Sequence, residues 1–212
     1  MFEPKTREEL QNAVNEWCDN KENAIKKYGD IKDWDVSNIT DMSRLFQAKE
    51  DFNDDISLWN VTNVKRMSFM FVDAKSFNQD IGCWNVSNVT NMEYMFMHAE
   101  SFNQNIGNWD VSCVTNMEYM FMNARSFNQD IGCWDVSNVT NMESMFMHAG
   151  SFNQDIGNWD VSNVRKMDDM FYRALSFNQD IRKWNVSQVK YHNDMFFGAL
   201  SFDIFNSPHF TT

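Results

Sequence analysis

The chain has 212 residues and a net charge of −12, with 30 Asp and Glu against 18 Lys and Arg. An acidic balance of this size argues against a nucleic-acid backbone or an anionic membrane as the partner, because like charges repel. Hydrophobic residues make up 43% of the chain and charged residues 23%, which excludes a disordered composition and is enough for one domain with a sizeable core.

Residues 1–32 predict a helical cap. Thr6 and Glu9 fit a capping box, and Leu10 and Trp17 follow at helical spacing. The segment lacks the apolar stretch of a secretory signal, and no apolar run in the chain is long enough to cross a bilayer. We therefore expect a non-secreted, cytoplasmic protein without membrane insertion, and a virion location if the source is viral.

Residues 33–207 contain seven copies of a 25-residue repeat. The clearest column is tryptophan, which recurs at Trp34, Trp59, Trp84, Trp109, Trp134, Trp159 and Trp184. Columns of Phe, of Val or Ile, of Met and of Ala keep the same step. Because one copy is too short to bury its own apolar face, this period predicts stacked copies rather than a single central core.

Each copy predicts a short helix and a short strand. The segment 90–96 has apolar residues at helical spacing, and Thr90 with Glu93 fits a second capping box, this one within the repeat. The segment 102–106 alternates apolar and polar residues, as a strand does. Together these elements predict a right-handed α/β solenoid of the leucine-rich-repeat type.

At the C-terminal end, residues 208–212 form a predicted tail. The seventh copy departs from the pattern, and apolar residues follow it at Ile204, Phe205 and Phe210. They fold over the last copy or dock onto another chain, and both alternatives stay open from the sequence.

The repeat resembles a known family. The string Trp134-Asp135-Val136-Ser137-Asn138-Val139-Thr140-Asn141-Met142, with Met145-Phe146 and Ser151-Phe152-Asn153-Gln154-Asp155-Ile156 after it, is similar to the BspA-like leucine-rich repeat. The resemblance covers nearly all of residues 33–207. It implies a leucine-rich-repeat solenoid with a binding or adhesion role, of the non-secreted type found in protists and large DNA viruses.

Polar columns in the repeat have two interpretations each. The slot of Asp110 and Asp135 holds Asn in other copies, so the shared property is an acceptor oxygen, as an Asx turn requires. A Ca²⁺ site between stacked carboxylates is the alternative. The column that contains Asn78 and Asn103 predicts an amide ladder that satisfies backbone groups, with sugar recognition as the alternative. The four cysteines predict free thiols.

One further set of apolar residues falls on the outer side of the predicted helix. This candidate interaction stripe comprises Phe69, Val72, Tyr94, Met97, Tyr119, Met122, Met147, Tyr172 and Phe197. A contiguous apolar stripe on a protein surface marks an interface, whereas packing between copies would make the same residues core. Both interpretations stay open here.

We expect a non-catalytic scaffold that mediates protein–protein interaction, because an extended stack is used mainly for binding. The sequence indicates no catalytic residues, cofactor, metal or small-molecule ligand, and the partner is another protein or a second copy of the chain. The alternatives are a structural component of a large DNA virus particle and a carbohydrate-binding or cell-surface adhesin, and both rest on the resemblance.

Overall fold

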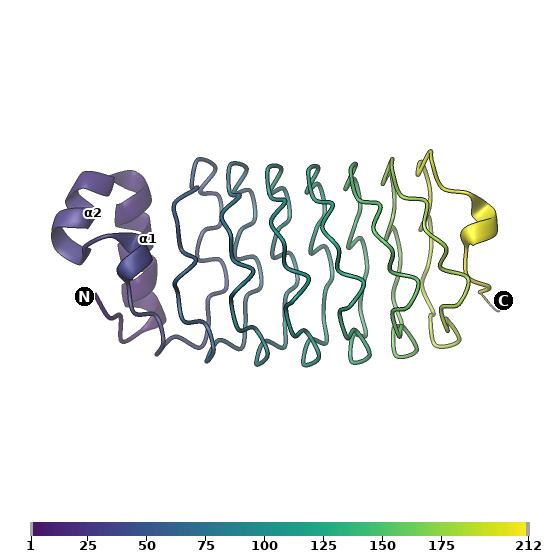
Figure 1. Ribbon diagram of the computed structural model, residues 1–212, viewed down its shortest axis with the longest axis horizontal. Coiled ribbons are helices and arrows are strands. Elements are labelled where there is room, and N and C mark those ends of the chain that lie inside the picture. Colours follow the sequence, from purple (N-terminus) through teal and green to yellow (C-terminus); the bar gives the residue numbers. More distant parts are fainter. Residues whose placement is uncertain (1, 211–212) are drawn as a thin grey trace.

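The computed structural model describes residues 2–210. Two α-helices come first, α1 (Arg7–Asp19) and α2 (Lys21–Tyr28), and single 3₁₀ turns follow at η1 (Ile31–Asp33) and η2 (Ile204–Asn206). Between the two 3₁₀ turns the chain winds as a row of stacked coils, with the helices at one end and η2 at the other (Figure 1). Residues 211–212 of the predicted tail lie outside the described residues.

Neighbouring coils are joined at the same position of the repeat. Isolated parallel β-bridges connect residues 25 positions apart, in the series Asp41, Arg66, Asn91, Asn116, Asn141, Lys166 and Tyr191. Each coil therefore lies in register on the next. One repeat makes one coil, and a given slot of the repeat forms a straight column along the stack.

The predicted α/β solenoid of the leucine-rich-repeat type is wrong, because the coils contain neither the predicted helix nor the predicted strand. In the segment predicted to be helical, Tyr94 and His98 have φ angles of 58° and 59°, in the left-handed region. An α-helix needs negative φ and bonds to the fourth residue back. Here the Met95 amide donates to the third residue back, Met92, as in a β-turn.

The hydrogen bonds between coils explain this outcome. The amides of Tyr94 and Phe96 donate to the carbonyls of Glu118 and Met120 in the next coil, at 2.8 and 2.9 Å. Successive tight turns aim alternate amides along the stack, so neighbouring coils replace the hydrogen bonds that a helix would form within itself. The predicted capping box at Thr90 is absent for the same reason. The Glu93 amide bonds instead to the Asn91 side chain, at 2.8 Å.

Side chains also replace the ladder of the predicted strand. The amide of Asn103 donates to Oδ1 of Asn78 in the preceding coil at 2.9 Å, and Gln104 Nε2 donates to the Asn78 carbonyl at the same distance. The same contacts recur along the column. The predicted amide ladder is therefore confirmed, although the backbone around it is not a β-strand.

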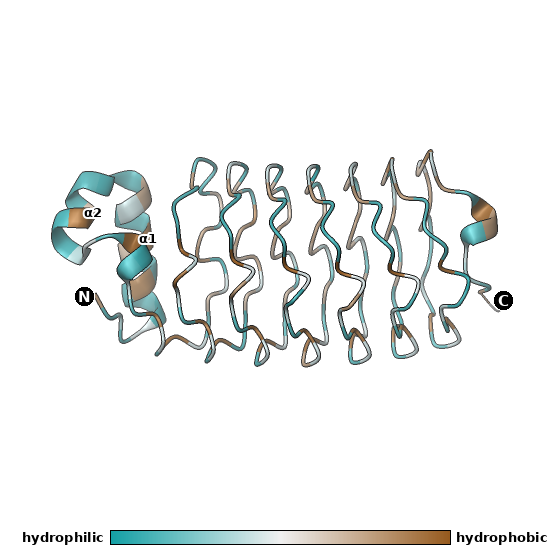
Figure 2. Cartoon of the chain, viewed as in Figure 1, coloured by the Kyte–Doolittle hydropathy of each residue, from teal (hydrophilic) through white to brown (hydrophobic). Residues whose placement is uncertain are grey.

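Aromatic rings fill the interior of the stack. Phe96 lies parallel to Phe71 in the preceding coil and to Phe102 in its own coil, with ring centroids 5.5 and 4.1 Å apart. Trp109 is buried, and its indole N–H donates to the Ile81 carbonyl at 3.1 Å, which removes the cost of burying that donor. Burial of one such ring stabilises the fold by about 2–3 kcal/mol. Apolar segments recur at the same places in successive coils (Figure 2).

The acidic corners of the coils form Asx turns. Asp110 Oδ1 accepts hydrogen bonds from the Ser112 amide at 3.0 Å and from the Ser112 hydroxyl at 2.6 Å. These bonds stabilise the carboxylate and lower the pKa of Asp110. Asp135 and Asp160 repeat the arrangement, and Asn85 makes the same turn with an amide oxygen. The Asx-turn prediction is confirmed.

Residues 2–210 contain neither a metal-binding cluster nor a membrane-crossing helix. No group of three or more His, Cys, Asp or Glu is placed to hold a metal ion. No helix in this range combines the length and apolar character of a membrane crossing. The cysteines are free, and Cys83, Cys113 and Cys133 are exposed.

Candidate functional site

Two adjacent columns on one side of the stack make up the candidate site, which we call the lateral site. The ring column consists of Phe69, Tyr94 and Tyr119, and the acidic column of Glu93, Glu118 and Glu143. Every one of these side chains is partly buried. The two columns are neighbours in the repeat: two coils supply a ring and a carboxylate together, one supplies only Phe69 and one only Glu143.

The rings of this column stack face to face. Phe69 and Tyr94 have centroids 4.5 Å apart, and Tyr94 and Tyr119 have centroids 4.6 Å apart. The three residues have φ angles of 60°, 58° and 56°. A left-handed conformation costs a residue with a side chain roughly 1–2 kcal/mol. Hydrogen bonds to the next coil hold that conformation, so the backbone fixes the direction in which the rings leave the turn.

A guanidinium group covers one end of the ring column. Arg44 occupies the same slot one coil before Phe69, and its Cζ lies 4.1 Å from the centre of the Phe69 ring. A cation over an aromatic face is attracted by the ring's negative face. The contact between Arg44 and Phe69 thus shows, within the molecule, a guanidinium group bound over a ring of this column.

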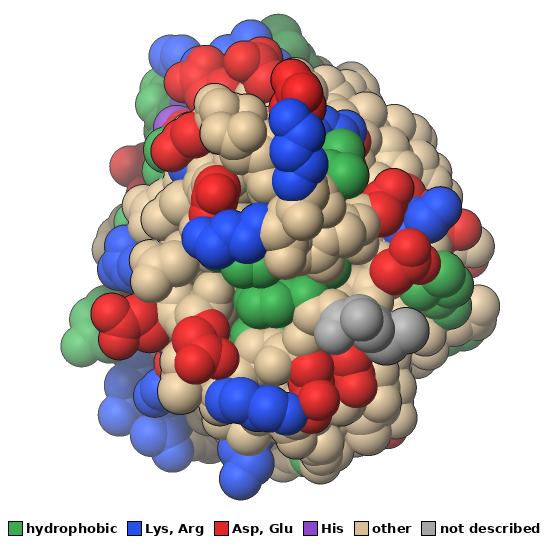
Figure 3. All heavy atoms as spheres, turned by 90° about the vertical axis from the view of Figure 1, so that its left-hand side faces the viewer, with side chains coloured by type: hydrophobic (Ala, Val, Ile, Leu, Met, Phe, Trp, Pro, Cys, Tyr) green, Lys and Arg blue, Asp and Glu red, His purple; other side chains and the backbone are tan. Residues whose placement is uncertain are grey.

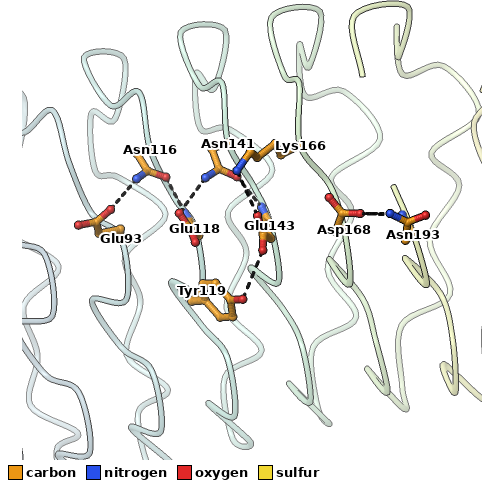
Figure 4. A network of polar contacts seen from close by, with 9 residues as sticks. All are labelled: Glu93, Asn116, Glu118, Tyr119, Asn141, Glu143, Lys166, Asp168 and Asn193. Carbon is orange, nitrogen blue, oxygen red and sulfur yellow. Dashed lines mark hydrogen bonds and ion pairs between the residues drawn. The ribbon is translucent and has the colours of Figure 1, made fainter. Parts of the chain in front are cut away.

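Asparagine side chains hold the acidic column in place (Figure 4). Asn116 Nδ2 donates to Glu93 Oε2 at 2.7 Å, and Asn141 Nδ2 donates to Glu118 Oε2 at 2.8 Å. The same asparagine then accepts from the next backbone, because the Glu118 amide donates to Asn116 Oδ1 at 3.1 Å. Each carboxylate is oriented by its neighbours and retains acceptor capacity for another donor.

The carboxylates of this column carry little compensating positive charge. Among the described residues, the column's ion pair is the one from Lys166 Nζ to Glu143, at 3.5 Å. Burial, and then the charge of Glu143, raise the pKa of Glu118. Burial and the charge of Glu118 also raise the pKa of Tyr94 to about 12. Burial opposes a charge of either sign, whereas the part of each shift that comes from neighbouring carboxylates opposes added negative charge and favours a cation.

Toward the C-terminal end the site becomes more acidic. The ring slot continues with Ser144, Asp169 and Asp194, and the carboxylate slot with Asp168. Asn193 Nδ2 donates to Asp168 Oδ1 at 2.7 Å. Ser144 is 1% exposed, and its hydroxyl has no hydrogen-bond partner among the described residues. The column thus changes along the stack from a guanidinium, through rings, to carboxylates.

A family comparison places the chain. The profile of the family described as "Mycoplasma protein of unknown function, DUF285" matches residues 9–130 and 102–207. The chain belongs to this family. The two DUF285 matches overlap over residues 102–130, as expected when a periodic chain fits one profile in more than one register. No curated protein and no solved structure matches the chain.

In this DUF285 chain the predicted interaction stripe falls into two columns. Phe69, Tyr94 and Tyr119 form the ring column of the lateral site. The other six residues occupy a slot three positions later, namely Val72, Met97, Met122, Met147, Tyr172 and Phe197. Val72 is buried at 5% exposure, the middle four are partly buried, and Phe197 is 57% exposed. Because the expected helix is absent, the nine residues do not share one outer helical face, and they lie in two separate columns of the stack.

The acidic column was missing from the sequence prediction. The capping-box prediction for Thr90 and Glu93 gives this slot of the repeat a structural role, and that assignment removed Glu93 and its equivalents Glu118 and Glu143 from the candidates. A signal was available, because an acidic residue recurs at four successive copies, two positions after the bridge residue of each coil. Column-by-column comparison, without an assumed helix, finds it.

Proposed function

We propose that this chain is a non-catalytic interaction module that binds a basic segment of a partner protein at the lateral site. The observation that carries the proposal is a column of parallel rings beside a column of carboxylates that are poorly compensated in charge. The rings cover one another and Arg44 covers Phe69. A Lys or Arg side chain placed there therefore meets a carboxylate and the face of Tyr119 on the side of Ser144.

The geometry favours an extended partner over a compact one. Rungs recur at about 4.8 Å, the spacing of hydrogen-bonded backbones, so three rungs of the site span roughly 10 Å. Alternate side chains of an extended peptide point to one side about 7 Å apart, and two of its basic residues can therefore meet different rungs. A second copy of the chain is the weaker candidate, because its net charge of −12 opposes approach to an acidic surface.

The BspA-like relationship is part of this proposal. The repeated string that carries the resemblance lies within the DUF285 matches. A binding role is consistent with that relationship. The alternatives of a virus-particle component and of a carbohydrate-binding adhesin rest on resemblance alone, and no contact among residues 2–210 favours either one. The absence of a catalytic role also stays a prediction.

Fluorescence anisotropy tests the proposal with a labelled peptide of alternating Arg and Ser, compared with alternating Gln and Ser. The protein variant E118Q/E143Q should weaken binding of the Arg peptide about tenfold, because it removes two carboxylates that face the ligand. The matched control is D110N/D135N, which makes the same change in net charge at Asx turns where Asn is already used. The control should change the affinity less than about twofold.

A second variant removes one ring while keeping the charges, and with that ring the hydrogen bond from the Tyr119 hydroxyl to Glu143 Oε1 at 3.4 Å. Y119S puts at this slot the residue that Ser144 places in the next coil, so the backbone conformation is retained. Loss of one ring face should weaken the Arg peptide by about two- to fivefold. Equal losses in E118Q/E143Q and D110N/D135N would show general charge attraction and overturn the proposal, as would equal binding of the two peptides.

A further inference from the structure

The last coil ends in a row of backbone donors. In the coil before it, the amides of Asp169, Phe171 and Arg173 donate to the carbonyls of Asn193, Met195 and Phe197 at 2.9, 2.8 and 2.8 Å. The corresponding amides of the last coil belong to Asp194, Phe196 and Gly198. No residue in the range 2–210 accepts a hydrogen bond from them. A row of unpaired amides is a template for another backbone.

The C-terminal segment covers a different part of this end. The Asn206 carbonyl accepts from the Ile181 amide at 3.1 Å, and the Phe210 ring stacks on His192 at 4.0 Å. Leu200 and Phe205 remain 83% and 82% exposed. The described part of the segment thus reaches His192, two residues before Asp194, and accepts no hydrogen bond from the amides of Asp194, Phe196 and Gly198.

A second copy of this chain does not fit the donor row. The complementary surface would be the carbonyl edge of the first coil, and α1 already covers it. Arg7 Nη2 donates to the Ser43 carbonyl, and Gln11 Nε2 donates to the Leu45 carbonyl at 3.0 Å. Two C-terminal ends face to face would set donors against donors. The occupant must therefore be a different backbone that supplies carbonyls.

Carboxylates beside the donor row indicate which side chains a docking segment would carry. Asp194 is exposed at the end of its column, with Asp169 in the same slot one coil earlier. Burial, and then the charges of Asp194 and Asp168, raise the pKa of Asp169. The neighbouring carboxylates of Asp194 and Asp168, rather than the burial, attract a cation to this corner of the donor row. The neighbouring Phe196 is partly buried and stacks on Phe171 at 5.8 Å, as rings do from coil to coil.

We propose that the last coil is a docking edge for an extended segment of a partner protein. The segment adds one more layer to the stack, with carbonyls facing Asp194, Phe196 and Gly198, a Lys or Arg opposite Asp194, and an aromatic ring opposite Phe196. This edge is separate from the lateral site, and neither proposal depends on the other.

A peptide with the sequence of residues 38–50 is the probe. It contains Arg44 and Phe46 in the slots that lie opposite Asp194 and Phe196 when one more coil is added. It should bind the full chain saturably, and the same peptide with R44E should bind at least about fivefold more weakly. The protein variant D194R should reverse this preference. Arg44 and Arg173 already occupy left-handed positions in this chain, so the backbone accepts Arg there.

Hydrogen exchange locates the bound peptide. The amides of Asp194, Phe196 and Gly198 should exchange rapidly in the free chain and slow at least about tenfold with saturating peptide. In E118Q/E143Q the peptide should protect the amides of Asp194, Phe196 and Gly198 to the same extent, and this local readout separates the edge from the lateral site. Equal binding of the unchanged peptide and its R44E form, or protection elsewhere, would overturn the proposal. Light scattering that shows a dimer dispersed by the peptide would assign the edge to a second copy and overturn it as well.

Discussion

The two ends of the stack differ in how the outward-facing backbone groups of the terminal coil are satisfied. At the N-terminal end, carbonyls of the first coil receive side-chain donors from Arg7 and Gln11 of α1. At the C-terminal end, the amides of Asp194, Phe196 and Gly198 meet no acceptor in the described chain. A helix can provide side-chain donors because its own backbone is satisfied internally. The comparison shows that one end is closed by a dedicated element and the other is half open.

The closed end also contains its own small core. Trp17 of α1 packs edge-on against Trp34 with centroids 5.7 Å apart, and its indole N–H donates to Asp54 at 2.7 Å. Phe2 packs against Tyr28 at 4.6 Å. The surface of this end carries acidic and basic side chains around a small apolar area (Figure 3). The open end instead exposes Leu200 and Phe205.

The largest expected effect on stability comes from truncating a phenylalanine at either end of one interior column. Phe46 is fully buried in the first coil under α1, whereas Phe196 is partly buried in the last coil. F46A should lower the free energy of unfolding by about 3–5 kcal/mol, since it leaves a cavity in a closed core. F196A should cost less than half as much. Urea denaturation measures both, and equal losses would show that the C-terminal end is as well covered as the N-terminal one.

A smaller effect should come from the donors of α1. R7M/Q11M keeps the length of the side chain at residue 11, shortens the one at residue 7, and removes the hydrogen bonds to the Ser43 and Leu45 carbonyls. Each unsatisfied carbonyl should cost about 1–3 kcal/mol, as judged by urea denaturation. E8Q, on an exposed position of the same helix, is the control and should be near neutral. A neutral R7M/Q11M would mean that water satisfies these carbonyls and that the two ends are equivalent.

The smallest effect concerns acid stability along the corners between the ends. Hydrogen bonds from Ser112 and Ser137 lower the pKa values of Asp110 and Asp135 in the folded chain. The resulting stabilisation is present above the unfolded pKa of about 3.9 and is lost as the pH falls through the lowered folded values. D110N/D135N should therefore match wild type in melting temperature at pH 7 and lose less of it at pH 3. A parallel fall in both proteins would remove these turns as a source of acid sensitivity.

The sequence predicted the period, the columns and the start of α1. The 25-residue spacing of tryptophan is read directly, and Thr6 caps the helix as expected, with the Glu9 amide donating to its Oγ1 at 3.1 Å. Asp and Asn shared corner slots because both accept from a backbone amide. These features depend on side-chain chemistry that each copy repeats, so they can be recognised without a backbone.

The secondary structure within a coil was not predictable in the same way. Met92, Met95 and Phe96 are all buried, so their spacing imitates a helix. The left-handed residues between them are Tyr94 and its equivalents, a residue type with no special preference for that conformation. Their conformation is set by hydrogen bonds to other coils. No local sequence pattern contains that information. The acidic column was not recognised as a candidate site because its glutamates were interpreted as caps of the expected helix.

The in-register joining of coils has a consequence for how such a chain changes in length. Because every inner coil presents the same amides forward and the same carbonyls backward, a duplicated 25-residue unit meets matching partners on both sides. Neither terminus has to be rebuilt. A gene that gains or loses whole units in its middle therefore encodes a longer or shorter stack of coils with unchanged ends. The number of repeated positions along the side of the stack then becomes the variable on which selection acts.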